Sequence, residues 1–293
     1  MKYPRILAAL RSAKWAVTPT TLQAIRDTLS ARLTGHLPTA KRADGDMDDD
    51  GDLEPVAPPP PYQMAGPGVA VVDMCGIIGK NLSGLEMMCG GCDIAAVESN
   101  LIAALAAPDT LAVVLNIDSP GGTVNGVAEF ASEIAELSAA SGKPVLAYAS
   151  GMCCSAAYWI ACGCAAIACS PSSDVGSIGV YMALMDESAN WAEEGYKLVL
   201  IKAGDFKAAG IAGSQITAEQ IALWQSDVDF IYAQFTSAVR ASRPGVADAT
   251  MQGQSFYGSR ALDAGLVDQL FSDVSDLAAE IAPSAANFTA KTP

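Results

Sequence analysis

Hydrophobic and polar positions alternate with different periods along the chain, and the clearest pattern lies in its middle part. Mainly apolar runs over Val69–Met74, Leu111–Ile117 and Val145–Ala149 predict buried strands, because strands of a parallel sheet are covered on both faces. Between these runs, Ile94–Ala107 and the residues that follow Val127 carry apolar side chains at helical spacing. The alternation of strands and helices predicts an α/β fold with right-handed βαβ units around a parallel sheet.

Weaker patterns follow in the C-terminal half. Apolar residues predict further strands near Ile178–Ala183 and Leu198–Lys202. A capping box formed by Thr217 and Gln220 begins a long helix. Six of its side chains, spaced to share one face, are predicted to point inward: Ile221, Trp224, Val228, Ile231, Phe235 and Val239. The uncharged stretch from Pro144 to Ser173 could span a membrane by length, but its Ser, Gly and Pro residues favour buried strands and a short helix.

The first 66 residues have a different character. Residues 1–36 are predicted to form an N-terminal amphipathic helical segment, with the helix itself over Thr21–Leu33. An acidic and proline-rich composition over residues 37–66 predicts an extended linker that cannot bury a core. We therefore expect one main folded domain over residues 67–283, followed by a tail over residues 284–293.

Composition narrows the classes of function. Of 293 residues, 51% are hydrophobic and 17% are charged, which is enough apolar material for a substantial core. The formal net charge of −15 repels phosphate backbones, so nucleic acid is excluded as a partner of the main domain. The N-terminal residues show no apolar signal core with a small-residue cleavage site, which favours a cytoplasmic protein with no membrane partner.

The eight cysteines are interpreted as reduced thiols that pack as small hydrophobic side chains. The alternative is a zinc site in which Cys89 and Cys92 are completed by Cys162 and Cys164. The second pair has C-x-C spacing, which is less usual for zinc, and no histidine lies nearby in the sequence. We therefore predict no metal and no cofactor.

The histidine count restricts the possible hydrolytic chemistry. The only histidine, His36, lies outside the predicted domain, so a Ser-His-Asp or Cys-His site in the core is improbable. A lysine with a lowered pKa is the usual substitute for histidine as a general base. Two lysines, Lys202 and Lys207, follow a predicted strand, which is where sites of α/β proteins collect.

Ser155 is the candidate nucleophile because it lies after the strand Val145–Ala149 and at the start of a short apolar helix. On these features alone an ordinary N-cap serine remains open, and Cys154 is a less favoured nucleophile. The turn Asp118–Gly122 contains two adjacent glycines whose N–H groups could point into a cleft as an oxyanion hole. Its alternatives are a plain βα turn and the carbonyl-binding loop of an acyl-CoA enzyme.

Five segments in this order resemble the signal peptide peptidase A-like serine peptidases. They are Asp118–Gly122, the Ser155 segment, Val175–Val180, Ile201–Lys207 and Gly265–Asp268, and the resemblance spans roughly residues 69–272. It implies a crotonase-like fold, a ββα superhelix like that of the caseinolytic protease. The missing membrane anchor and the segment Trp15–Pro19 are most similar to the phage and prophage branch, which matures heads by cutting capsid or scaffold proteins.

The resemblance also implies residue roles. Ser155 would be the nucleophile and Lys207 the general base, which favours Lys207 over Lys202. The N–H groups of Gly121, Gly122 and Ala156 would form the oxyanion hole, and Ser177 would support the lysine. Two departures affect this assignment: alanines replace the family's glycines after Ser155, and an acidic residue and a proline expected near Lys207 are missing.

The resemblance further implies a homo-oligomer in which Ser155 of one subunit meets Lys207 of the next, with protein or peptide substrates in the host cytoplasm or the virion precursor. Three alternatives stay open. They are a general peptide-degrading peptidase of the same family, an inactive scaffolding homologue, and a crotonase-like acyl-CoA enzyme. The last of these would need a basic patch for the CoA phosphates, which the acidic main domain does not supply.

Overall fold

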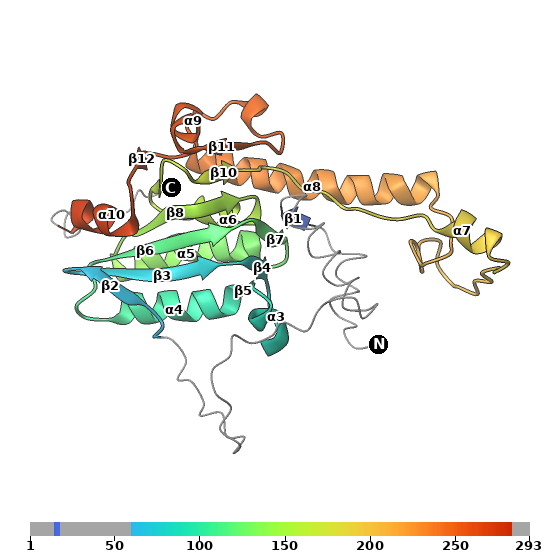
Figure 1. The fold of residues 1–293 in the computed structure, drawn as a ribbon, viewed down its shortest axis with the longest axis horizontal. Coiled ribbons are helices and arrows are strands. Elements are labelled where there is room, and N and C mark those ends of the chain that lie inside the picture. The colour runs from blue at the N-terminus through green and yellow to red at the C-terminus, as the bar shows by residue number, and fades with distance from the viewer. Residues whose placement is uncertain (1–14, 18–59, 283–293) are drawn as a thin grey trace, which may run out of the picture.

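A computed structural model describes residues 15–17 and 60–282 of the chain, and Figure 1 shows their arrangement. The main sheet contains, in spatial order, β11 (Ser255–Tyr257), β10 (Asp174–Gly176), β8 (Val145–Cys154), β6 (Ala112–Ser119), β3 (Val69–Cys75) and β2 (Gln63–Gly66). β9 (Ile167–Cys169) also pairs with β8, and β12 (Gln269–Leu270) pairs with β9. The four central strands, β10, β8, β6 and β3, run parallel, which confirms the α/β fold with a parallel sheet.

Successive side chains of the central strands pack on opposite faces of this sheet. On one face, Ala70 and Val72 of β3 share a core with α4 (Ile94–Ala106) and α5 (Val127–Ser141). On the other face, Val69 and Val71 pack with α10 (Val274–Ile281). Because the strands are covered on both sides, their sequences are apolar at nearly every position. Both α4 and α5 lie where helical spacing predicted them.

A second, smaller sheet has the order β1 (Trp15–Val17), β7 (Gly121–Thr123), β4 (Ile77–Gly79) and β5 (Gly91–Asp93), and a short helix, α3 (Gly84–Met88), precedes β5. Two predictions about the N-terminal region change here. The end of the predicted linker forms β2, and part of the predicted helical segment forms β1, so both contribute to the fold of the main domain. The helix predicted over Thr21–Leu33 and the rest of the linker lie outside the described residues.

A long helix, α8 (Ala218–Ser242), begins at the predicted capping box and would be about 37 Å long at the usual rise per residue. Its C-terminal half is fixed to α6 (Ala156–Ala161) because the rings of Trp159 and Phe235 stack with their centroids 4.7 Å apart. Its N-terminal half extends away from the sheet toward α7 (Ser188–Glu193) (Figure 1). The prediction of one inward face is therefore correct for Phe235 and Val239, which are buried, and wrong for Ile221, which is exposed.

The two strands predicted near Ile178–Ala183 and Leu198–Lys202 are not formed. Residues 198–202 have no regular structure, and the first segment makes only an isolated bridge at Tyr181. Val199 and Ile201 are exposed although they are β-branched and apolar, and Ile201 is 97% exposed. An apolar run predicts coverage by other groups, but within the described chain most of this run stays exposed. Two short helices complete the C-terminal part, η1 (Asp248–Thr250) and α9 (Gly258–Asp263).

Candidate active site

Ser155 lies at the turn that joins the end of β8 to the start of α6. Its backbone angles are φ 57° and ψ −117°, a region that residues with a Cβ atom rarely adopt. Such strain persists only where the surrounding structure holds it, and it is found at functional sites. A serine on a sharp strand-to-helix turn is also the arrangement of the nucleophile elbow in α/β hydrolases. The sequence therefore correctly predicted that Ser155 lies between a strand and a helix.

Hydrogen bonds from neighbouring segments hold the strained turn. The Ser155 N–H donates to the Gly176 carbonyl at 2.7 Å, and its own carbonyl accepts from the Trp159 N–H at 3.0 Å. The side-chain hydroxyl has a much weaker contact, because Oγ lies 3.4 Å from the Gly179 carbonyl oxygen. The backbone is thus fixed by short bonds, while the hydroxyl can exchange its long bond for another partner at little cost.

The segment Val175–Val180 lies beside Ser155. Gly176 of β10 is the register partner of Cys154, the residue before the serine. Ser177 is buried and also has a positive φ, 51°, and its N–H donates to the Gln254 carbonyl at 2.8 Å. Ser177 directly follows Gly176, which accepts the hydrogen bond from the Ser155 N–H, so two strained residues lie close together, as is common at functional sites.

The two predicted oxyanion glycines lie on β7, which packs against α6. Gly121 has φ 98°, which glycine adopts at no steric cost, and its N–H donates to Ser119 Oγ at 3.2 Å. A Cβ atom on Gly122 would lie 1.9 Å from the Ile78 carbonyl oxygen, so only glycine fits there. Sequence reasoning did not identify Ser119, whose hydroxyl also donates to the Gly76 carbonyl at 2.6 Å.

Ser155 and the glycine turn lie at the same end of neighbouring strands. Ser119 at the end of β6 is the register partner of Cys153 in β8, two residues before the serine. Ala156 is the first residue of α6, so its N–H is among the four that a helix leaves without an intrahelical acceptor. Donors of the type that an oxyanion requires are therefore gathered at one edge of the structure.

Lys207 lies in the segment between α7 and α8. Its side chain is exposed, and its backbone N–H donates to the Gly204 carbonyl at 3.2 Å. This segment packs near Trp224 on α8, whereas α6 contacts Phe235 of the same helix. The helical rise puts these two contact points roughly 16 Å apart along α8. Figure 1 shows α7 at the end of α8 that is remote from the sheet. Within one protomer, the structure does not bring Lys207 to Ser155.

Two other lysines have their own contacts. Lys143 Nζ donates to the carbonyls of Leu105 and Ala107, at 2.6 and 2.8 Å, and so binds the C-terminal end of α4. Lys202 Nζ donates to the carbonyl of Asp205, in the same exposed segment as Lys207. Neither contact involves the serine.

A family model, Peptidase family S49, matches residues 138–286, about half of the chain. The chain belongs to peptidase family S49. The match contains Ser155, the strained loop with Ser177, and the segment of Lys207.

Three curated proteins are similar to this S49 chain. The head-tail preconnector protein GP5 of Enterobacteria phage P21 is 30% identical over 69% of this chain. The capsid assembly protease C of Escherichia phage lambda is 28% identical over 76% of it, and Protease 4 of Salmonella typhi is 32% identical over 60%. The S49 chain spans 40%, 50% and 29% of the lengths of these three proteins.

Solved structures similar to the S49 chain include two different enzymes. The 1510-N membrane-bound stomatin-specific protease has a TM-score of 0.41 at 18% identity, with 73% of this chain and 84% of that one covered. An enoyl-CoA hydratase/isomerase family member has a TM-score of 0.40 at 18% identity, with 76% of this chain and 74% of that one covered.

Among the residues that the structure describes, no helix is both long and apolar enough to cross a membrane.

The cysteines of the S49 chain do not form the alternative metal site. Over residues 15–17 and 60–282, no three potential metal-ligating side chains of the Cys, His, Asp or Glu type come together. Burial raises the pKa of Cys92, Cys154 and Cys162 to about 12, and it also raises the pKa of Cys153. These thiols are protonated at neutral pH, which makes Cys154 a poor nucleophile next to Ser155.

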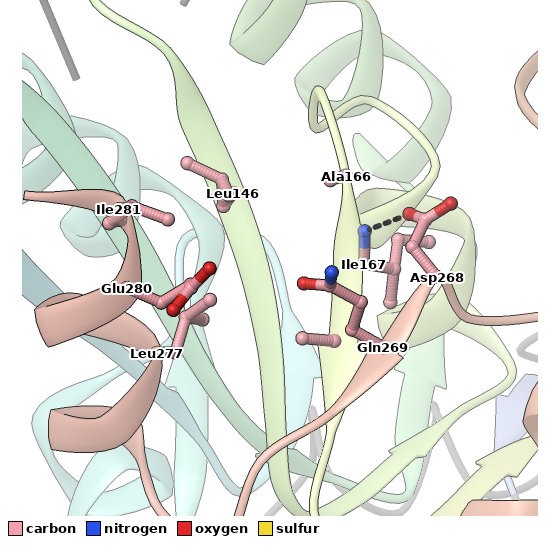
Figure 2. Close-up of a pocket in the computed structure, with 9 residues that line it drawn as sticks. Leu146, Ala166, Ile167, Asp268, Gln269, Leu277, Glu280 and Ile281 are labelled. Carbon is pink, nitrogen blue, oxygen red and sulfur yellow. Dashed lines mark hydrogen bonds between the residues drawn. The ribbon is translucent and has the colours of Figure 1, made fainter. Parts of the chain in front are cut away.

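A cavity of about 320 Å³ lies between β8, β9, β12 and α10 (Figure 2). Its apolar lining includes Leu146, Ile167 and Leu277, and its polar lining includes Asp268 and Glu280. None of the predicted site residues lines it. The Asp268 carboxylate accepts a hydrogen bond from the Ile167 N–H at 2.9 Å and forms an ion pair with the guanidinium of Arg243.

Proposed function

We propose that the chain is a serine endopeptidase in which Ser155 is the nucleophile and Lys207 of a neighbouring protomer is the general base. The observation that carries this proposal is the strained serine at the turn from β8 to α6, in an S49 chain with one histidine. Ser155 Oγ attacks the carbonyl carbon of the scissile bond while the neutral lysine amine takes the hydroxyl proton. The lysine then gives this proton to the leaving amine, and water hydrolyses the acyl-enzyme in a second step.

The oxyanion of the tetrahedral intermediate needs two N–H donors. Ala156 supplies one from the start of α6, and the Gly121–Gly122 turn supplies the other. Because the Gly121 N–H already donates to Ser119 Oγ, Gly122 is the favoured donor of the pair. Ser177 accepts or donates a hydrogen bond at the lysine amine and orients it.

A lysine acts as a base only where apolar surroundings disfavour its charged form. The segment around Lys207 supplies such groups, but in the protomer they face solvent. Exposed apolar side chains near it include Val199, Ile201, Phe206 and Ile211. A neighbouring copy that covers these side chains would also dehydrate the lysine and could bring it to Ser155. This exposure supports a homo-oligomer with shared active sites.

The substrates that we propose are capsid or scaffold proteins cut during phage head assembly. Two of the similar proteins are named as a head-tail preconnector protein and a capsid assembly protease of phages, which supports this choice over general peptide degradation. The protein has no cofactor in this mechanism, because serine, lysine and backbone amides supply every group that the reaction needs.

Three substitutions test the dyad on a denatured protein such as casein. Ser155→Ala and Lys207→Ala are each expected to abolish cleavage. Lys202→Ala is the matched control. This lysine lies in the same exposed segment, and its amine donates to the backbone carbonyl of Asp205. Cleavage that survives either of the first two changes, or is lost equally in the control, contradicts the assignment.

Mixing the two inactive variants tests the sharing of sites. In an equal mixture of Ser155→Ala and Lys207→Ala chains, about half of the chains keep the serine and about half of their neighbours keep the lysine. About a quarter of the shared sites therefore contain both intact residues. Activity should therefore recover to about a quarter of the native value. No recovery after verified subunit exchange argues for a site within one chain.

A further inference from the structure

The three residues of β1 lie along the strand that carries the two oxyanion glycines. β1 pairs antiparallel with β7, with Trp15 opposite Thr123, Ala16 opposite Gly122 and Val17 opposite Gly121. The other edge of β7 is taken by β4, where Ile78 pairs with Gly122. Figure 1 shows β1 beside β7 at the margin of the smaller sheet. β1 therefore covers the edge of β7 that β4 leaves open.

This edge is where a peptide substrate would have to lie. A scissile carbonyl that accepts a hydrogen bond from the Gly122 N–H must belong to a chain that runs close beside β7. Proteins bind extended peptides at such open edges by adding them as a further strand. Two chains cannot occupy the same edge, so β1 and a bound peptide exclude each other.

We propose that Trp15–Val17 is an intramolecular competitor for extended peptides: it occupies the outer edge of β7 in the resting chain and must leave before a peptide can bind there. The proposal rests on the proposed function for the position of the substrate. The segment has the form of a bound peptide, since the strand register places Ala16 opposite Gly122 and Val17 is only 2% exposed.

The size of the contact agrees with a displaceable strand. Three residues form few ladder bonds, and β1 joins the fold at the edge of a sheet rather than at its centre. Tethering compensates for this weakness, because a segment attached to its own site acts at an effective concentration on the order of millimolar. The segment therefore excludes dilute peptides and yields to substrates that are present at high local concentration, as in an assembling particle.

Peptide binding tests the proposal without any need for turnover. The probe is a fluorescein-labelled synthetic peptide with the sequence of residues 13–18, and its affinity is measured by anisotropy in a Ser155→Ala background. Two further variants release β1: Val17→Asp puts a charge at the buried position, and Ala16→Pro removes a backbone donor from the strand. Ile102→Asp, which adds the same charge at an exposed position of α4, is the matched control.

Both releasing variants are expected to bind the probe at least about tenfold more tightly than the Ser155→Ala parent, while the control binds as the parent does. Equal affinity in all four proteins, or no binding by any of them, overturns the proposal. Both releasing variants should also keep the melting temperature of the parent. If both unfold, β1 is a structural part of the core and the proposal is wrong.

Activity separates this proposal from the proposed function. With Ser155 restored, Val17→Asp is expected to cleave casein faster than the native chain, chiefly through a lower KM, because the competitor acts on binding. Tighter probe binding without cleavage of any substrate supports the competitor and contradicts the peptidase. Cleavage at the native rate and KM, with unchanged probe affinity, contradicts the competitor and leaves the peptidase supported.

Discussion

Two ion pairs near the C-terminal end of α8 differ mainly in burial, and this difference predicts how much each stabilises the fold. Arg243 binds Asp268 through two bonds of 2.5 and 2.7 Å, and their side chains are 10% and 40% exposed. Arg240 binds Asp248 at 2.8 Å, with side chains 50% and 79% exposed. Breaking a fully buried pair costs roughly 3–5 kcal/mol, because one charge is left without a partner.

The substitution Asp268→Asn keeps the shape of the side chain and one acceptor oxygen, and the carboxylate is partly hydrated already. We therefore expect the free energy of unfolding to fall by about 2 kcal/mol, a loss of roughly 4–8 °C in melting temperature for a chain of this size. The same change in the exposed pair, Asp248→Asn, should cost less than about 1 kcal/mol. Urea unfolding followed by circular dichroism measures both values.

A double variant tests the cause of this loss. Adding Arg243→Met to Asp268→Asn removes the stranded charge, so the double variant should be more stable than Asp268→Asn alone. Equal losses for the two Asp→Asn variants, or a double variant less stable than the single one, would refute the reasoning from burial.

Three further predictions follow from single positions. Gly122→Ala should lower the free energy of unfolding by roughly 1–3 kcal/mol and abolish casein cleavage, because the added Cβ meets a backbone carbonyl. The control Gly84→Ala adds its Cβ in open space, so it should change neither urea unfolding nor casein cleavage. Phe235→Ala should cost about 3–5 kcal/mol in urea unfolding, and Phe230→Ala, exposed on the same helix, less than about 0.5. Burial and two nearby carboxylates raise the pKa of Cys75, so iodoacetamide should modify it more slowly at pH 8 than free cysteine, with a rate that increases with pH.

The parts of the fold that the sequence predicted are those in which local pattern and burial agree. The apolar runs of β3, β6 and β8 predicted strands covered on both faces, and the structure places helices on each side of them. The position of Ser155 was also predictable, because a strand, a glycine and serine turn and an apolar helix follow one another within a few residues. The role of this serine remains a prediction.

The parts that the sequence did not predict depend on distant partners. β1 has three residues, and the strand with which it pairs lies more than a hundred positions later, so no local pattern specified it. The run Leu198–Lys202 was predicted to be a strand because it is apolar, yet it has no regular structure and is largely exposed in the protomer. An apolar pattern predicts that a surface will be covered, but it does not state whether the same chain or another copy will cover it.

If another copy covers that run, assembly controls the chemistry, because one contact would bury the apolar side chains and complete the active site. Ile201→Asp places a charge on a side chain that is almost fully exposed in the protomer, so the melting temperature of the protomer should not change. The charge would be buried in the contact between copies, so the variant should sediment as a monomer and should not cleave casein. Ile102→Asp, at an exposed position of α4, should change neither oligomeric state nor activity. An Ile201→Asp monomer that cleaves casein at the native rate would show that each chain carries a complete site, and Lys207 would then have no role as the base.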